Sequence, residues 1–156
     1  LFRSLQARPS ARACVLSFSR TLARATVRRP VGTLLDVGTG CGVQVLHCSG
    51  HAKHRTATDV SARALDMARV TFALCGLDVE VLAGPWLEPV AGRRFDQIVS
   101  NPPFVPGPPQ VDHVYRDSGL GGDGASALLV GALPAAASAR ALDHLLGTPE
   151  NTKEMA

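Results

Sequence analysis

One stretch constrains the fold of this chain more than any other: the run LLDVGTGCG, which occupies Leu34–Gly42. The apolar run Thr33–Val37 has the pattern of a strand buried on both faces. Three glycines at alternate positions follow it, and they suit a tight turn that brings backbone N–H groups close to a ligand. A helix is expected over Val43–Cys48, with its N-terminus facing the same place. The sequence therefore predicts a strand–turn–helix unit that cradles a ligand. Its glycines are Gly38, Gly40 and Gly42.

Asp59 adds a second signal to this turn. A strand is expected over His54–Thr58, and Asp59 ends it, 21 residues after Gly38. An acid at that place in a βαβ unit can accept hydrogen bonds from both ribose hydroxyls of a nucleoside. Two plainer readings remain open: the glycine run is only a tight connection, and Asp59 only caps the next helix. Because Gly42 is followed by valine, the run is not the G-x-G-x-x-G of dinucleotide-binding proteins.

Three further elements complete the expected sheet. A helix is predicted over Ser61–Leu74, where apolar residues recur at helical spacing. Strands are predicted over Asp78–Ala83 and Phe95–Ser100, and the second of these leads into Asn101–Phe104, which reads NPPF. In open parallel α/β sheets, ligands bind at the carboxyl ends of the strands. The glycine turn, Asp59 and the NPPF tetrapeptide should therefore converge.

At these residues the chain resembles the class I S-adenosylmethionine-dependent methyltransferases. The NPPF tetrapeptide is similar to that of the branch that methylates planar amino groups, such as the glutamine amide and the adenine and guanine amines. The resemblance implies a Rossmann-like, three-layer α/β/α fold with a mostly parallel sheet, and S-adenosylmethionine as the cofactor. The family stretches are Leu34–Gly42, Ala57–Leu65 and Phe95–Phe104. The sequence resembles most an actinobacterial group of methyltransferases without an assigned substrate. The matching stretches are Thr21–Gly32, Thr39–His47, Ser100–Val105 and Tyr115–Gly119.

The resemblance also implies a set of site residues. The cofactor-binding residues would come from the glycine turn and from the segments after the second and third strands: Asp36, Gly38, Thr39, Gly40, Gly42, Asp59, Val60 and Trp86. Trp86 would cover the adenine face, with a core filler as the alternative. Family members usually carry Asp after the glycine at position 84, where it accepts a hydrogen bond from the adenine amino group. Pro85 stands there instead, and the lost contact would weaken cofactor binding by about 0.5–1.5 kcal/mol.

The expected catalytic residues are Asn101, Pro102, Pro103 and Phe104. The Asn101 side-chain oxygen and the Pro102 carbonyl can each accept one N–H of the target amine. The two prolines stiffen the backbone, and Phe104 can stack on the planar group. A sulfonium methyl is already activated, so the site needs orientation more than a strong base. The hydrogen bonds strengthen as positive charge develops on nitrogen. A plain turn after a strand is the alternative.

Arginine is concentrated at the start of the chain. Seven arginines and no acidic residue precede Asp36, although the net charge is only +3. Three readings are open: a basic arm for RNA or DNA, a composition like that of a transit peptide, and a non-native start. The last is favoured for Leu1 to about Ser17, because the chain lacks an initiator Met and the resemblance begins near Thr21. We expect 1–20 to lie outside the fold, an incomplete domain over 21–147, and a tail over 148–156.

Cysteine and histidine spacings predict no metal site. Cys14, Cys41, Cys48 and Cys75 form no C-x-x-C pair, and scattered cysteines suit a reducing cytoplasm. No run approaches the ~18 apolar residues of a membrane span. The resemblance implies as partner a protein or nucleic acid that presents an amino group, and no membrane is expected.

The region after the NPPF tetrapeptide predicts an incomplete sheet. Val105–Asp123 is rich in Pro and Gly and reads as a loop over the site. Gly124–Leu146 is expected to form one helix, or two broken at Pro134. The family has seven strands in the order 3-2-1-4-5-7-6, so the C-terminal strands are missing here, and the outer edge of the fourth strand is expected to be exposed. Two function classes remain: an N-methyltransferase, and a remnant or binding module that keeps the fold without activity. A nicotinamide oxidoreductase is less favoured because the glycine spacing fails.

Overall fold

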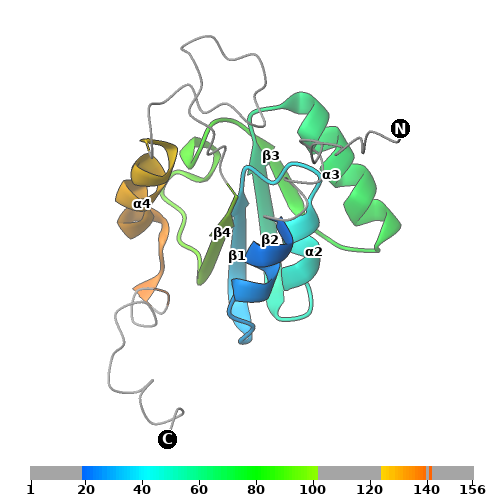
Figure 1. The fold of residues 1–156 in the computed structure, drawn as a ribbon, viewed down its shortest axis with the longest axis horizontal. Coiled ribbons are helices and arrows are strands. Elements are labelled where there is room, and N and C mark those ends of the chain that lie inside the picture. The colour runs from blue at the N-terminus through cyan, green and yellow to red at the C-terminus, as the bar shows by residue number, and fades with distance from the viewer. Residues whose placement is uncertain (1–18, 102–123, 140, 142–156) are drawn as a thin grey trace, which may run out of the picture.

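The computed structural model describes residues 19–101, 124–139 and 141. Within them, a parallel sheet lies between helices (Figure 1). In chain order the strands are Val31–Val37 (β1), Ala52–Asp59 (β2), Glu80–Ala83 (β3) and Gln97–Ser100 (β4). The helices are Val43–Cys48 (α2), Ala62–Leu74 (α3) and Gly124–Ala136 (α4), with a 3-10 turn at Glu88–Val90 (η1). Residues 19–25 are also helical.

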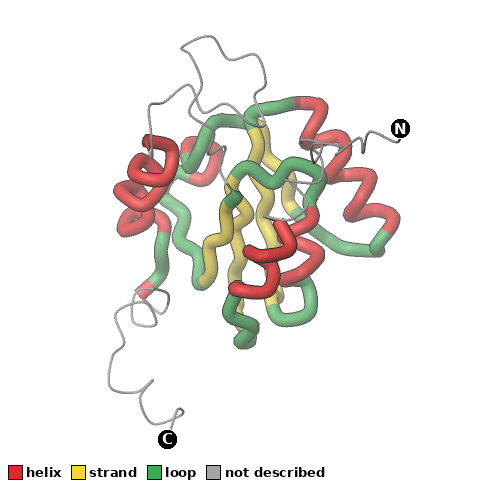
Figure 2. Tube along the Cα trace, in the orientation of Figure 1, coloured by secondary structure: helices red, strands yellow, loops and turns green. Residues whose placement is uncertain are grey.

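The strand order is β3-β2-β1-β4, and every pairing is parallel. Helices flank the strands on both sides of the sheet (Figure 2). This arrangement confirms the predicted three-layer α/β/α fold, including the order of the first four strands. β4 is the edge strand of the sheet that the described residues form.

The core explains why β1 carries adjacent apolar residues, Leu34 and Leu35. Consecutive strand residues point to opposite faces of a sheet, and here both faces are covered. Leu34 packs in a cluster with Cys48 of α2, whereas Leu35 packs in a cluster with Val90 and Leu129. Both leucines are fully buried, and each such side chain contributes about 1.5–3 kcal/mol through burial. β1 is thus the central strand on which both layers of helices rest.

The strands β1 and β4 begin at residues other than those predicted. β1 starts at Val31, whose N–H donates to the His51 carbonyl at 2.9 Å. β4 starts at Gln97 instead of Phe95, because the side chain of Asp96 interrupts the ladder. Asp96 Oδ2 accepts the N–H groups of Gly32 and Thr33, both at 3.0 Å. These contacts lie in tertiary structure, so strand propensity could not indicate them.

The boundaries of β2, β3 and α3 move by fewer than three residues, whereas α4 ends at Ala136, ten residues before the predicted Leu146. β2 runs over Ala52–Asp59, and β3 begins at Glu80 rather than Asp78. The predicted loop after β3 contains the 3-10 turn η1. α4 continues through Pro134 to Ala136, so this proline does not break the helix. Pro134 lies close to the helix end, and the Ala137 N–H still donates to the Leu133 carbonyl at 2.7 Å.

Several predicted segments lie outside the described residues. They include Pro102–Phe104, the expected loop Val105–Asp123 and the tail over 148–156. The helix over residues 19–25 contains Ser19 and Arg20, which we had placed before the domain. None of the helices in the described ranges has the length and apolar character that a membrane span requires.

Candidate functional site

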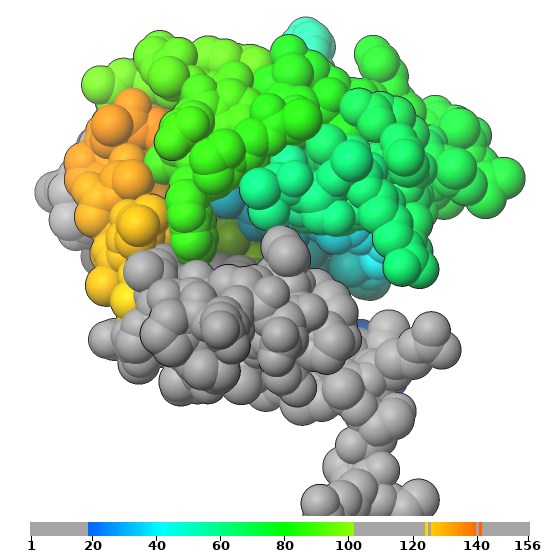
Figure 3. Space-filling model, turned by 90° about the horizontal axis from the view of Figure 1, so that it is seen from above, coloured from blue at the N-terminus to red at the C-terminus, as the bar shows by residue number. Residues whose placement is uncertain are grey.

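The sheet register brings three predicted site positions to one edge. Val37, near the end of β1, pairs with Thr58 of β2 on one side and with Ser100 of β4 on the other. The residues that follow these positions are Gly38, Asp59 and Asn101. Figure 3 looks down onto this edge, where α3 and the segment after β3, in green, lie opposite α4, in yellow to orange. The glycine turn therefore lies between the acid and the asparagine.

The three glycines of the turn have different roles. All have positive φ, at 70° for Gly38, 58° for Gly40 and 85° for Gly42, a region that L side chains rarely adopt. A Cβ at Gly38 or Gly40 would meet no heavy atom within 4 Å, so the space beside them is open. A Cβ at Gly42 would lie 2.5 Å from Phe72 Cε1. Two glycines thus leave room for a ligand, and the third lets the turn pack on α3.

Most backbone N–H groups of the turn already have acceptors in the protein. Those of Gly38 and Thr39 both donate to the Thr58 carbonyl at 2.9 Å, and that of Gly42 donates to the Thr39 carbonyl at 2.9 Å. The Gly40 N–H donates to Asp59 Oδ2 at 2.9 Å. The predicted donation from these N–H groups to a ligand is therefore not available in this conformation. What the turn offers a ligand instead is open space beside Gly38 and Gly40, where no side chain prevents contact with the backbone.

Asp59 connects the glycine turn to the start of α3. In addition to the bond from Gly40, its Oδ1 accepts the Ser61 N–H at 2.9 Å. The helix cap is Ser61, whose side chain accepts the Ala64 N–H at 3.4 Å, so the reading of Asp59 as the cap is wrong. A carboxylate has about four acceptor positions, and two remain on the half-buried Asp59. Val60 follows it at the same edge and is 61% exposed.

Asp36 lies beneath the turn and is fully buried. Its Oδ2 accepts the Thr39 Oγ1 hydroxyl at 2.7 Å, which fixes the turn from below. Its Oδ1 has no hydrogen-bond partner within the described part of the chain. Burial raises the pKa of Asp36 to about 7, against the lowering effect of the Thr39 hydrogen bond, and the negative charge of Asp59 adds to the rise. The site thus holds a buried carboxyl that a cationic ligand group would stabilise in its charged form.

Trp86 and Pro85 belong to the segment that leaves β3. The Gly84 N–H donates to the Asp59 carbonyl at 3.0 Å, so this segment starts beside Asp59. Trp86 has a positive φ of 48°, which is uncommon for an aromatic residue. It is half-buried and packs against the cluster that contains Leu35 and Val90. This placement supports the core-filler reading, and contact with adenine stays a prediction. Pro85 is exposed.

Asn101 directly follows β4 and is half-buried. The preceding Ser100 donates its hydroxyl to the Val37 carbonyl at 2.8 Å, which ties the end of β4 to the end of β1. Pro102, Pro103 and Phe104 lie outside the described residues. Asn101 is therefore the one member of the predicted catalytic set whose position can be related to the turn.

Two polar contacts were missed in the sequence: one is buried beside α2, and one is half-buried at the start of β2 and β4. Gln44 Nε2 donates to the Ser19 carbonyl at 2.9 Å, which holds the helix over residues 19–25 against α2. His51 Nε2 and Gln97 Oε1 are 2.8 Å apart. A polar residue within an apolar helix, such as Gln44 in VQVL, was the available signal. No group of three or more His, Cys, Asp or Glu side chains in the described ranges is arranged to hold a metal ion.

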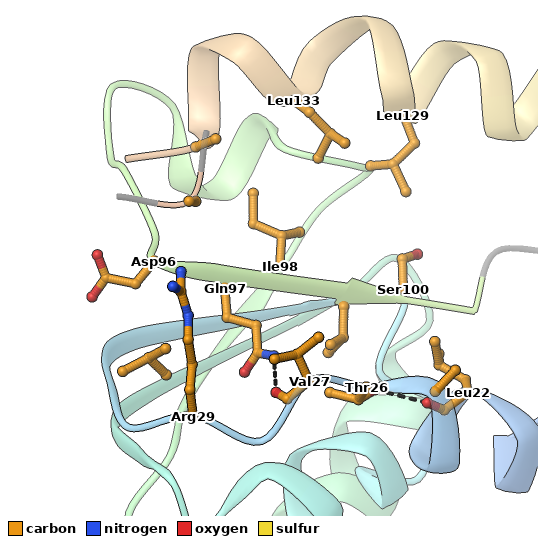
Figure 4. Close-up of a pocket in the computed structure, with 15 residues that line it drawn as sticks. Leu22, Thr26, Val27, Arg29, Asp96, Gln97, Ile98, Ser100, Leu129 and Leu133 are labelled. Atoms are coloured by element: carbon orange, nitrogen blue, oxygen red, sulfur yellow. Dashed lines mark hydrogen bonds between the residues drawn. The ribbon is translucent and has the colours of Figure 1, made fainter. Parts of the chain in front are cut away.

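A hollow of about 410 Å³ lies along the outer edge of β4, away from the glycine turn. Leu22 and Val27 line one side, and Leu129 and Leu133 of α4 point toward Ile98 on the other (Figure 4). Its lining is mostly apolar and contains neither the turn nor Asp59. We therefore propose the turn, where the acids and the open space are found, as the site of the chemistry, and not this hollow.

Comparisons with known proteins bear on the family of this chain. The profile of the family described as "Methyltransferase small domain" matches residues 16–116. The chain is 45% identical over 78 residues to ribosomal RNA small subunit methyltransferase C of Salmonella arizonae, a match that covers 49% of this chain and 22% of that protein. The same-named protein of Salmonella newport gives the same identity and coverage. The chain thus spans about a fifth of the length of these curated relatives.

A solved structure from Pyrococcus horikoshii, provisionally named an RNA methyltransferase, shares the fold. Its TM-score is 0.50 at 19% identity, over 75% of this chain and 52% of that chain. At this identity the likeness bears on the fold alone.

Proposed function

Because the chain belongs to the methyltransferase small domain family, we propose that it transfers a methyl group from S-adenosylmethionine to a planar amino nitrogen of a nucleic acid or protein. The observation that carries the proposal is the register of β1 with β2 and β4, which sets Asp59 and Asn101 on either side of the glycine turn. A cofactor on the turn would then lie between an acceptor for its ribose and an acceptor for the target amine.

S-adenosylmethionine is the cofactor of the family, and the residues of the turn fit it. The space beside Gly38 and Gly40 is open, and two acceptor positions on Asp59 remain for ribose hydroxyls. Asp36 beneath the turn has a pKa of about 7 and an unpartnered Oδ1, so a cationic ligand group would favour its ionised form. When bound, the cofactor supplies an activated methyl group on a sulfonium.

Asn101 would orient the target amine. Its side-chain oxygen accepts one N–H of the amine, which fixes the nitrogen and directs its lone pair toward the methyl group. The rate gain comes mainly from this positioning. As positive charge develops on nitrogen, the hydrogen bond to Asn101 strengthens. The Ser100–Val37 contact at 2.8 Å keeps the end of β4, and so Asn101, in register with the turn.

Among planar amines we favour a nucleobase amine of RNA over a glutamine amide. The curated relatives, 45% identical over 78 residues, are named ribosomal RNA methyltransferases. Their match covers 49% of this chain.

Asn101→Ala tests the proposed catalytic role. We expect it to lower methyl transfer to RNA by about 10- to 100-fold, because it removes a hydrogen bond that strengthens with developing charge. Calorimetric affinity for S-adenosylmethionine should change less than about twofold, since Asn101 contacts the amine and not the cofactor. Transfer is measured with radiolabelled cofactor on total RNA and on a protein extract.

Asn101→Asp is the matched control, because it keeps an acceptor oxygen at nearly the same place. It should retain more activity than the alanine variant. Equal transfer by the wild type and Asn101→Ala would show that this residue does not orient the amine. A folded chain that binds no S-adenosylmethionine would favour the remnant reading over the enzyme.

Pro85→Asp should strengthen cofactor binding. The aspartate would supply an acceptor for the adenine amino group, worth about 0.5–1.5 kcal/mol, or roughly a 2- to 12-fold gain in affinity. Pro85→Ala, which adds no acceptor, is the control, and calorimetry measures both. The gain should disappear with the S-inosyl analogue, which lacks that amino group. An equal gain in both variants would attribute the effect to loop flexibility.

A further inference from the structure

A line of arginines lies on the exposed side of the helix over residues 19–25 and of the segment that follows it. Arg20 and Arg24 are four residues apart and therefore lie on the same helix face, and both are exposed. Arg28 follows and is also exposed. Its Nη2 donates to the Ala23 carbonyl at 3.2 Å, which holds it against the helix end. We call Arg20, Arg24 and Arg28 the arginine stripe.

The stripe has no acidic neighbours in sequence or in the described structure. Residues 19–35 contain four arginines and neither Asp nor Glu. The ion pairs formed within the described ranges are Arg69–Asp66 and Arg93–Glu80, and neither involves the stripe. An exposed group of positive charges without compensating acids produces a positive potential that attracts a polyanion.

The stripe is fixed on the domain close to the proposed active site. The Ser19 carbonyl accepts the Gln44 amide at 2.9 Å at one end of the helix, and the Val27 carbonyl accepts the Gln97 amide at 2.8 Å just beyond the other. Leu22 of this helix lines the same hollow as Ser100, near the carboxyl end of β4 (Figure 4). Leu22 is two residues from both Arg20 and Arg24, so these arginines project from the other side of the helix, toward solvent.

We propose that the arginine stripe binds the phosphate backbone of an RNA that is methylated at the proposed active site. This inference rests on the proposed function for its acceptor. An arginine guanidinium group can donate two parallel hydrogen bonds to two oxygens of one phosphate. Helix positions four residues apart are separated by about 6 Å along the axis, so Arg20 and Arg24 present two charges along the helix, and Arg28 adds a third at its end. Such a line suits the repeating phosphates of one strand better than the scattered carboxylates of an acidic protein.

The test is the salt dependence of RNA binding. A fluorescein-labelled RNA hairpin of mixed sequence is titrated with the full chain from 50 to 200 mM KCl (about the range in which phosphate contacts dominate), and anisotropy gives the affinity. Arg20→Gln/Arg24→Gln should lower the slope of log K against log[KCl] by about 1.4–1.8, since each lost phosphate contact removes about 0.7–0.9. At the lowest salt, affinity should fall by about tenfold or more.

The matched control is Arg63→Gln/Arg69→Gln on the exposed side of α3, which removes the same charge elsewhere. It should leave the slope within about 0.5 of the wild type. Arg20→Lys/Arg24→Lys retains the charge and should retain most of the slope. Equal losses in the glutamine variant and the α3 control would overturn the stripe as the binding surface. Displacement of the hairpin by polyglutamate as effectively as by polyuridylate would overturn RNA in favour of an acidic protein.

Two readouts separate this proposal from the proposed function. S-adenosylmethionine binding, measured by calorimetry, should be the same in the wild type and in both glutamine variants. If the chain binds the cofactor and transfers methyl groups, but the salt slope of RNA binding is the same with and without Arg20 and Arg24, the stripe proposal is contradicted and the methyltransferase proposal stands. If the salt slope of RNA binding depends on Arg20 and Arg24 but no methyl group is transferred, the stripe proposal is supported and the proposed reaction is contradicted.

Discussion

Asp59→Ala is expected to lower the affinity of the chain for S-adenosylmethionine by at least about a hundredfold. Two ribose hydroxyls bonded to a carboxylate contribute about 1.5–3 kcal/mol each, which corresponds to two or more powers of ten. The same substitution leaves the N–H groups of Gly40 and Ser61 without their present acceptor. The turn and the start of α3 then lose the side chain that joins them. The affinity therefore falls both because the ribose loses its acceptor and because the turn loses its conformation.

Calorimetric titration measures this loss, with circular dichroism to follow the fold. Asp78→Ala is the matched control, since it removes an exposed carboxylate that lies before β3. Asp59→Asn separates the two effects: it keeps one acceptor oxygen for the turn but removes the charge. If Asp59→Ala bound the cofactor as tightly as Asp78→Ala, the cofactor site would have to lie elsewhere on the domain.

Asp36→Asn is expected to raise the stability of the chain at pH 8. The folded carboxyl keeps its proton up to a pKa of about 7, whereas its ordinary value is 3.8. Between these values the folded state binds more protons than the unfolded state, so stability falls as the pH rises. The difference reaches roughly 3–5 kcal/mol above pH 7. Asparagine carries no charge, escapes this loss and can still accept the Thr39 hydroxyl.

Urea unfolding of both proteins at pH 4 and pH 8 measures this effect. Near pH 4 the two should differ little, because that pH is close to the ordinary carboxyl pKa of 3.8, where the loss of stability is only beginning. Asp66→Asn, at an exposed carboxylate on α3, is the control and should show no comparable gain at pH 8. Lower stability of Asp36→Asn at both pH values would mean that the ionised carboxylate is satisfied within the fold.

The local sequence predicted the elements well where one signal dominated. Leu34 and Leu35 are adjacent apolar residues, and only a strand covered on both faces buries both. The glycine turn and Asp59 were predicted at the ends of β1 and β2, where the structure places them. Prediction was poorer where a side chain acts at long range. Asp96 shortens β4 by accepting N–H groups more than 60 positions away in the chain, and no local pattern indicates that.

The sequence by itself determined the succession of strands and helices and the position of the glycine turn, because these depend on the period of apolar residues and on the spacing of glycines; the strand order and the family were implied by the resemblance of its motifs. Only the tertiary structure decided what each site residue is free to do. It showed that turn N–H groups of Gly38 and Thr39 already donate to Thr58, and that one oxygen of Asp36 lacks a partner. Hydrogen-bond satisfaction and burial depend on which strands become neighbours, and that is a property of the folded sheet.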